Sequence, residues 1–120
     1  MAAESELSSP LAPPALPGRG QSAQWQHLPE LGAPLAVVKA AQARRGFSMV
    51  VTESGASAER WMRELAFFDP TLPLMSFPDR ETLPYDAFSP HQDIISDRLA
   101  CLFALRHRAT DSGPVVLVIP

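Results

Sequence analysis

The sequence predicts an α/β fold, with an open, mainly parallel sheet and flanking helices. Three observations lead to this prediction. Segments with helical spacing alternate with short, mainly apolar runs of strand length. The connections between the runs are long enough for right-handed parallel crossovers. The runs are apolar at successive positions, as strands covered on both faces are. The expected order is helix, strand, helix, strand, long loop, helix, strand.

Composition limits the size, location and partners of the protein. With 120 residues, 46% of them hydrophobic, the chain is one ordinary domain at most. A net charge of −3 argues against binding nucleic acid by electrostatics alone, although local basic patches are compatible with it. One cysteine allows no disulfide within the chain, which suits a reducing cytoplasm. No apolar run approaches the roughly 18 residues of a membrane span, so we predict a cytoplasmic protein without a membrane partner.

The domain is expected to follow a flexible tail. Residues 1–26 are rich in proline and have no apolar periodicity, which predicts a disordered N-terminal tail. The ordered domain is predicted to occupy residues 27–120. Because the chain ends directly after a strand that needs a cover, we expect this domain to be incomplete at its C-terminus.

The first half of the domain contains two predicted helices and two predicted strands. An alanine-rich helix at 34–45 begins with Pro34 in its first turn and is stopped by Gly46. The apolar run at 47–52 is a strand, and a second helix, capped by Ser54 or Ser57, follows it. One face of this second helix is apolar, and a short strand at 72–77 comes next. That face carries Trp61, Met62, Leu65 and Phe68.

A stiff loop comes next, because Pro78, Pro84 and Pro90 each remove an amide donor and fix φ. The loop spans 78–89. Loops of this length are uncommon unless they are functional or packed by their own side chains. The side chains expected to pack it are Leu83, Tyr85 and Phe88.

A third helix is predicted at 90–107. Ser89 has the position of an N-cap, Pro90 that of the first helical residue, and Gln92 completes a Ser-x-x-Gln capping box. Apolar residues recur at helical spacing and are expected to form one stripe; they are Ile94, Ile95, Leu99, Leu102 and Phe103. Cys101 lies in this helix and is expected to be a small buried apolar group. The final predicted strand is 115–119.

A nucleotide site is the first possibility to test in such a sheet. The nearest candidate for a phosphate loop runs from Gly32 to Lys39. It fails at three required positions, because the second glycine is Val37, the lysine is Val38 and the hydroxyl residue is Lys39. We therefore expect this stretch to bind no ATP.

Neither a metal site nor a catalytic site is predicted. His91 and Asp93 stand two positions apart, and on a helix such a pair points to different faces. The same argument excludes a catalytic triad with Ser89. The acids of the first turn are instead expected to interact with the helix dipole. No catalytic, cofactor-binding or metal-binding residue is assigned.

Five polar residues around the loop are candidates for a contact with another domain or a partner. They are Tyr85, Asp86, His91, Gln92 and Arg98. A second interpretation is that they hold the loop to its own sheet by hydrogen bonds, and the sequence does not decide between the two. A basic face formed by Arg44, Arg45, Arg60 and Arg63 is expected to be an ordinary solvated surface, with Arg60 and Glu64 as an i, i+4 pair.

The same loop carries a family resemblance. The run Glu81-Thr82-Leu83-Pro84-Tyr85-Asp86, followed by Phe88-Ser89-Pro90-His91-Gln92-Asp93-Ile94-Ile95-Ser96 and Arg98-Leu99, resembles the signature near the start of the bacterial transcription-repair coupling factors. The order of elements up to the closing residues 114–120 is similar to the first domain of that family. The resemblance implies an N-terminal fragment whose fold is like the first domain of the excision-repair helicase UvrB, RecA-like and with a degenerate phosphate loop.

The resemblance also implies a function. In that family the full-length protein displaces RNA polymerase stalled at DNA lesions with an ATP-driven translocase on double-stranded DNA, and it recruits nucleotide-excision repair through the A subunit of the excinuclease. The motor, with its ATP and Mg²⁺, lies downstream, so this chain is expected to be a non-catalytic scaffold beside the downstream domains. The alternative is a nucleotide- or DNA-binding enzyme domain with an atypical phosphate loop.

Overall fold

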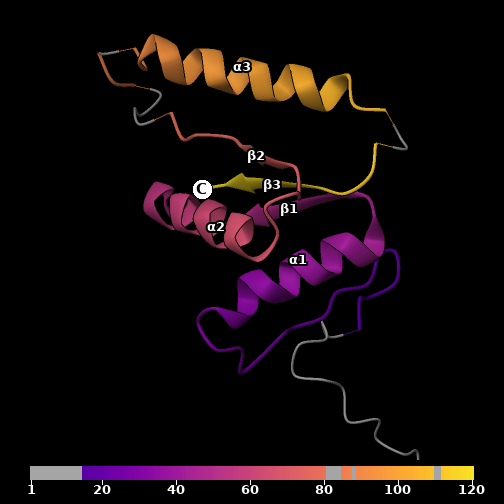
Figure 1. The fold of residues 1–120 in the computed structure, drawn as a ribbon. Helices are drawn as coiled ribbons and strands as arrows, with labels where there is room; N and C mark the ends of the chain where they lie inside the picture. The colour runs from indigo at the N-terminus through magenta and orange to yellow at the C-terminus, as the bar shows by residue number, and fades with distance from the viewer. Residues whose placement is uncertain (1–14, 81–84, 88, 110–111) are drawn as a thin grey trace, which may run out of the picture.

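The computed structural model describes residues 15–80, 85–87, 89–109 and 112–120, and they form an α/β fold (Figure 1). The elements follow in the order α1 Gly32–Arg44, β1 Phe47–Val51, α2 Gly55–Phe68, β2 Leu74–Ser76, α3 Gln92–Arg106 and β3 Val115–Ile119. The predicted class and order of elements are confirmed. Residues 15–26 contain neither helix nor strand, and the rest of the predicted tail lies outside the described residues.

The three strands form one open parallel sheet in the order β1-β3-β2. The central strand β3 places Val116 opposite Ser48 of β1 and Leu74 of β2. In Figure 1, α1 and α2 lie on one face of the sheet and α3 on the other. The β2 strand is shorter than predicted, although the Phe77 amide still donates to the Val118 carbonyl over 3.0 Å.

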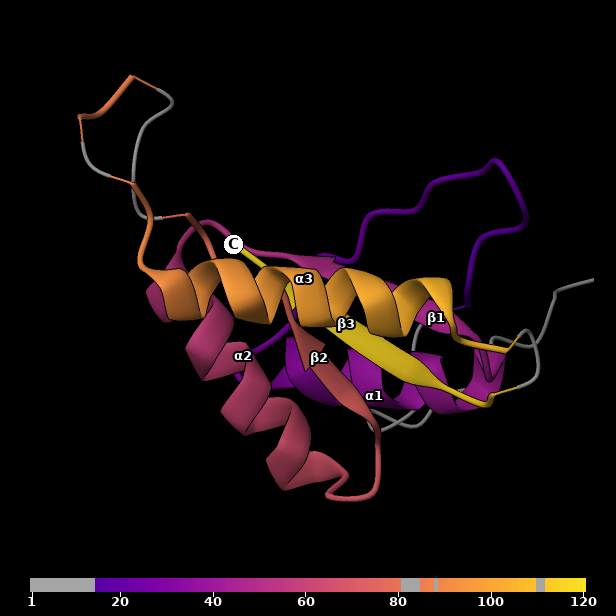
Figure 2. The same ribbon diagram turned by 90° about the horizontal axis from the view of Figure 1, so that it is seen from above.

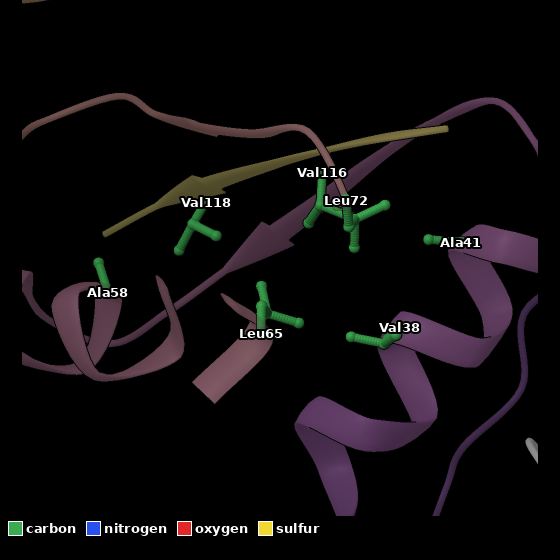
Figure 3. Packing of buried hydrophobic residues seen from close by; sticks show 7 residues of the cluster. All are labelled: Val38, Ala41, Ala58, Leu65, Leu72, Val116 and Val118. Carbon is green, nitrogen blue, oxygen red and sulfur yellow. The ribbon is translucent and has the colours of Figure 1, made fainter. Parts of the chain in front are cut away.

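The hydrophobic core fills the space between the sheet and the pair α1 and α2. Leu65 has an exposed fraction of 0% and lies at its centre (Figure 3). The predicted apolar face of α2 is confirmed, because Trp61, Met62 and Phe68 pack against the core. The buried residues of this core are Val38, Ala41, Ala58, Leu65, Leu72, Val116 and Val118.

Two of the predicted helix ends can be compared in detail with the structure. Ser54 is the N-cap of α2, and its hydroxyl accepts a hydrogen bond of 3.1 Å from the Ser57 amide. Ser57 is therefore inside the helix, where its own hydroxyl donates to Glu53. At the end of α1 the left-handed residue is Arg45, with φ 53°, and its amide donates to Ala41 over 2.9 Å. The chain thus leaves the helix one residue before Gly46.

The predicted start of α3 is wrong. The helix begins at Gln92, and the N-cap is His91, with ψ 139°, instead of Ser89. The imidazole Nδ1 of His91 accepts the Asp93 amide over 3.3 Å, which is the role predicted for the Ser89 hydroxyl. With His91 extended and capping, the helix cannot include it, so Pro90 lies two residues before the first turn.

Four of the five residues predicted to form one apolar stripe of α3 do lie on one side of the helix, but that side is exposed, and Ile94 lies on another face. Cys101 is buried, as expected, but most of the large apolar side chains of the helix are exposed. The exposed ones are Ile95, Leu99, Leu102 and Phe103. Helical spacing places the other apolar residues, such as Cys101 and Leu105, on a different face from this group. The helix is therefore apolar on two adjoining faces, and only one of them is covered.

Within the part of the chain that the structure describes, we find no helix with the length and apolar character that crossing a membrane requires.

Candidate functional site

The five polar residues predicted as a contact surface do not form one cluster. Tyr85 has an exposed fraction of 98%, and Asp86 is also exposed. Both belong to the segment 85–87, which lies beyond the first turn of α3 and away from the sheet (Figure 2). Tyr85 therefore does not pack the loop as predicted. The other residues expected to do so, Leu83 and Phe88, lie outside the described residues.

Arg98, unlike the exposed Tyr85, contacts its own domain: it connects α3 to the start of the loop. Its guanidinium Nη1 donates a hydrogen bond of 2.6 Å to the Pro78 carbonyl oxygen. The same group lies over the Phe77 ring, 4.1 Å from the ring centroid. For Arg98 the second interpretation, a lock between the loop and its own domain, is the one that the geometry supports.

His91 and Gln92 lie at the start of α3, and both are exposed. The argument that His91 and Asp93 point to different faces is wrong. Because His91 is a cap outside the helix, its Nδ1 lies 3.5 Å from the Asp93 carboxylate. Asp93 is the acid of the first turn, as the helix-dipole interpretation predicted. Among the described residues, no group of three or more His, Cys, Asp or Glu side chains is placed to hold a metal ion.

The stretch tested as a phosphate loop is helical in this structure. Gly32 through Lys39 lie in the first two turns of α1, and Val38, at the position of the required lysine, is 1% exposed and belongs to the core. A Cβ on Gly32 would meet the Pro29 ring at 2.7 Å. The Gly32 amide also donates to the Pro29 carbonyl over 2.8 Å. The glycine is therefore required by the approach of Pro29.

A polar junction that sequence reasoning missed joins the end of α2 to α1. Asp69 accepts hydrogen bonds from the Thr71 hydroxyl at 2.6 Å, the Gln42 side chain at 2.7 Å and the Thr71 amide at 2.9 Å. These hydrogen bonds hold the pKa of the Asp69 carboxyl below its ordinary value. The bond from the Thr71 hydroxyl has the largest effect on the pKa. The Asp-Pro-Thr pattern after the helix was the available signal, because Asp side chains in turns bond the amide two residues on. The hydrogen bond from Gln42 had no such signal in the sequence.

The basic face on the first two helices is solvated, as expected. Arg60 contacts the Glu64 carboxylate at 3.9 Å, which confirms the predicted i, i+4 pair, and Glu30 at 3.4 Å. The Arg60 and Glu30 side chains are largely exposed, so pairs of this kind contribute little to stability.

Comparison with known proteins finds similar sequences among the transcription-repair coupling factors. The chain is 44% identical over 73 residues to a transcription-repair-coupling factor of Haemophilus influenzae, and this region is 61% of the chain. It is 41% identical over 69 residues to the transcription-repair-coupling factor of Escherichia coli strain K12, over 58% of the chain. The chain is homologous to the transcription-repair coupling factors. The resemblance predicted from the loop signature is thereby confirmed.

The chain spans a small part of the coupling factors that it matches, because each aligned region is 6% of the relative's length. No protein-family model matches the chain. The placement within a UvrB-like module is not tested by these comparisons and stays a prediction.

Proposed function

We propose that the chain is the non-catalytic N-terminal scaffold piece of a cytoplasmic transcription-repair coupling factor. It would be the first domain of a UvrB-like module, with a phosphate loop that has degenerated. In the full-length protein, this domain would support the downstream domains that displace RNA polymerase stalled at DNA lesions. Those domains would contain the ATP-dependent, Mg²⁺-requiring motor on double-stranded DNA and the contact with the A subunit of the excinuclease.

The observation that carries this proposal is the identity of 44% with a named coupling factor. At this level of identity over 73 residues, the two proteins share ancestry and fold in the aligned part. The absence of a catalytic role is supported by the conformation of α1. A phosphate loop presents several unbonded backbone amides to the phosphates. Here a helical turn stands in that place, Pro34 has no amide to offer, and Val38 is in the core.

The role of this domain in ATP binding is tested by thermal unfolding of the chain in the presence and absence of millimolar MgATP. A ligand at 100 times its dissociation constant adds about 2.7 kcal/mol to stability, which is readily measured as a rise in Tm. We expect no rise for the wild type and none for Lys39→Ala. A rise that Lys39→Ala abolishes would favour the alternative, a nucleotide-binding enzyme domain.

The role in coupling is tested with the full-length protein that contains this sequence. The assay follows release of RNA polymerase stalled on DNA in the presence of ATP. We expect the wild type to release polymerase. ATP hydrolysis by the downstream motor should continue when residues 1–120 are removed, because the proposal assigns no catalytic group to them. Loss of the hydrolysis reaction itself on this deletion, with the remaining domains folded, would contradict the proposal.

A further inference from the structure

The four arginines predicted as one basic face divide into two groups in the structure. Arg60 pairs with Glu30, just before α1, and with Glu64 on α2. Arg44 and Arg45 lie at the other end of α1, about 18 Å from its start along the helix axis. Both are exposed, and no ion pair to either is found among the described residues. Within the described part of the domain, this second group therefore has no carboxylate that neutralises it.

The end of α3 adds further cations at the same end of the domain. Helices α1 and α3 lie on opposite faces of the sheet, and both end where the strands begin (Figure 1 and Figure 2). Arg106 is in the last turn of α3, and Arg108 follows the helix. A cavity of about 490 Å³ lies between the start of β1 and the end of α3, and it is lined by Arg108 and by Gly46, next to Arg45. We call Arg44, Arg45, Arg106 and Arg108 the basic end.

The helix dipole explains only part of this arrangement. Cations in the last turn of a helix are favoured by the dipole, which accounts for Arg44 and Arg106. Arg45 has a left-handed backbone, with φ 53°, a conformation in which glycine is preferred and a long side chain lowers stability. Arg108 lies beyond α3, and its guanidinium donates a hydrogen bond to the Gly113 carbonyl. The domain thus keeps a cation at Arg45 in spite of the backbone strain, which points to a role for the side chain in binding.

An exposed aromatic stack lies at the same end of α3. The rings of Phe103 and His107 have their centroids 4.0 Å apart and an angle of 29° between their planes. The His107 Nδ1 lies 2.9 Å from the Phe103 carbonyl oxygen, and this hydrogen bond fixes the imidazole ring. Both residues are exposed. A third aromatic residue, Phe47, lines the cavity. Aromatic rings held beside guanidinium groups are typical of surfaces on which unpaired bases stack.

We propose that the basic end binds a single-stranded nucleic acid, with the arginines on its phosphates and the Phe103–His107 stack against one of its bases. The guanidinium group suits phosphate because it presents several N–H donors in one plane. A duplex cannot make the second contact, since its bases are already paired and stacked. The net charge of −3 limits long-range attraction, so binding depends on these local groups. The inference goes beyond the proposed function, which assigns double-stranded DNA to the downstream motor.

Fluorescence anisotropy of labelled oligonucleotides tests the inference on the 120-residue chain. The probes are oligo-dT and oligo-rU of about twelve nucleotides and a DNA duplex of the same length. We expect the single strands to bind more tightly than the duplex, and the tighter of the two identifies the sugar that the site prefers. Up to four phosphate contacts predict that log Kobs falls with log salt with a slope of about −2 to −3. Equal binding of the duplex, displacement by oligo-glutamate at the same charge, or no binding at all would overturn the inference.

An arginine variant separates binding from folding. Arg45→Gly relieves the left-handed backbone, so it should raise Tm, and it should weaken binding of oligo-dT about fivefold at about 0.1 M salt. The matched control is Arg63→Ala, which removes the same charge from an exposed position of α2. It should change the Kd by less than about twofold, because salt screens distant charges. Wild-type affinity in Arg45→Gly, or equal losses in the two variants, would refute the site.

A second variant tests the aromatic stack. Phe103→Leu keeps an apolar side chain but removes the ring, so binding of oligo-dT should weaken at least about fivefold. The control is Phe67→Leu, at another exposed aromatic position, which should bind like the wild type. Circular dichroism establishes that both variants fold. In the full-length coupling factor, ultraviolet cross-linking of oligo-dT should mark the peptide that contains Phe103 and His107. Cross-links confined to the downstream domains would contradict the inference and leave the proposed function unaffected.

Discussion

The Arg98 guanidinium donates a hydrogen bond of 2.6 Å to the Pro78 carbonyl across 20 positions of sequence. It also lies over the ring of Phe77, next to Pro78. One side chain on α3 thus fixes the point where the chain leaves β2 and enters the proline-containing loop. This contact is one of those that hold α3 beside the sheet.

Removing this contact should weaken the fold. A hydrogen bond to a charged donor and a cation–π contact at a partly exposed site together predict that Arg98→Ala lowers the free energy of unfolding by about 1 to 2 kcal/mol. Urea denaturation followed by circular dichroism measures the effect. Arg63→Ala, on the exposed side of α2, is the control and should change the value by less than about 0.5 kcal/mol. Equal effects of the two substitutions would show that Arg98 is not a lock.

The two serine positions considered as helix caps should now behave differently. Ser54→Ala removes the hydroxyl that accepts the Ser57 amide, so we expect a loss of about 1 kcal/mol in the free energy of unfolding. Ser89→Ala should have almost no effect, because His91 is the cap of α3. Denaturant titration of both variants is the measurement. A larger loss of unfolding free energy for Ser89→Ala than for Ser54→Ala would support Ser89 as the cap of the third helix.

The centre of the core should be the most sensitive position to truncation. Leu65→Ala leaves a cavity between α1, α2 and the sheet, and buried leucines lose about 2 to 5 kcal/mol on this change. Since small domains have about 5 to 15 kcal/mol of stability in total, the variant should be close to unfolding. Phe67→Ala, at a position 78% exposed, is the matched control on the same helix. Equal Tm values for the two variants would contradict the position of Leu65 at the centre of the core.

The Asp69 junction should make stability depend on acid pH. Its folded pKa lies below the ordinary value of 3.8, so the ionised form is favoured in the folded state. The resulting stabilisation is present above pH 3.8 and is lost as pH falls through the lower folded pKa. Asp69→Asn should remove this part of the pH dependence. Urea midpoints of wild type and variant, taken from about pH 5 down to about pH 2, measure it. Parallel curves would show that Asp69 titrates alike in both states.

The sequence by itself determined the class of fold, the order of its elements and the resemblance to the coupling factors. The strands were predictable because their apolar runs are short and lie between turn residues, and α2 because its apolar residues recur at helical spacing. The coupling-factor family was predictable because the loop signature is long. These are local properties of the chain, so they can be read without knowing what lies beside them.

Tertiary structure decided the start of α3, the role of Arg98 and which apolar face of α3 is exposed. Ser89 and His91 are both able to accept an amide, and in the structure His91 has the extended backbone of the cap. The five polar residues of the loop separate into a lock and exposed groups because one of them reaches Pro78. Likewise, the apolar residues of α3 look alike in sequence, but Cys101 is buried whereas Ile95 and Leu99 are exposed. Burial depends on what the fold brings alongside each residue, and no local pattern contains that information.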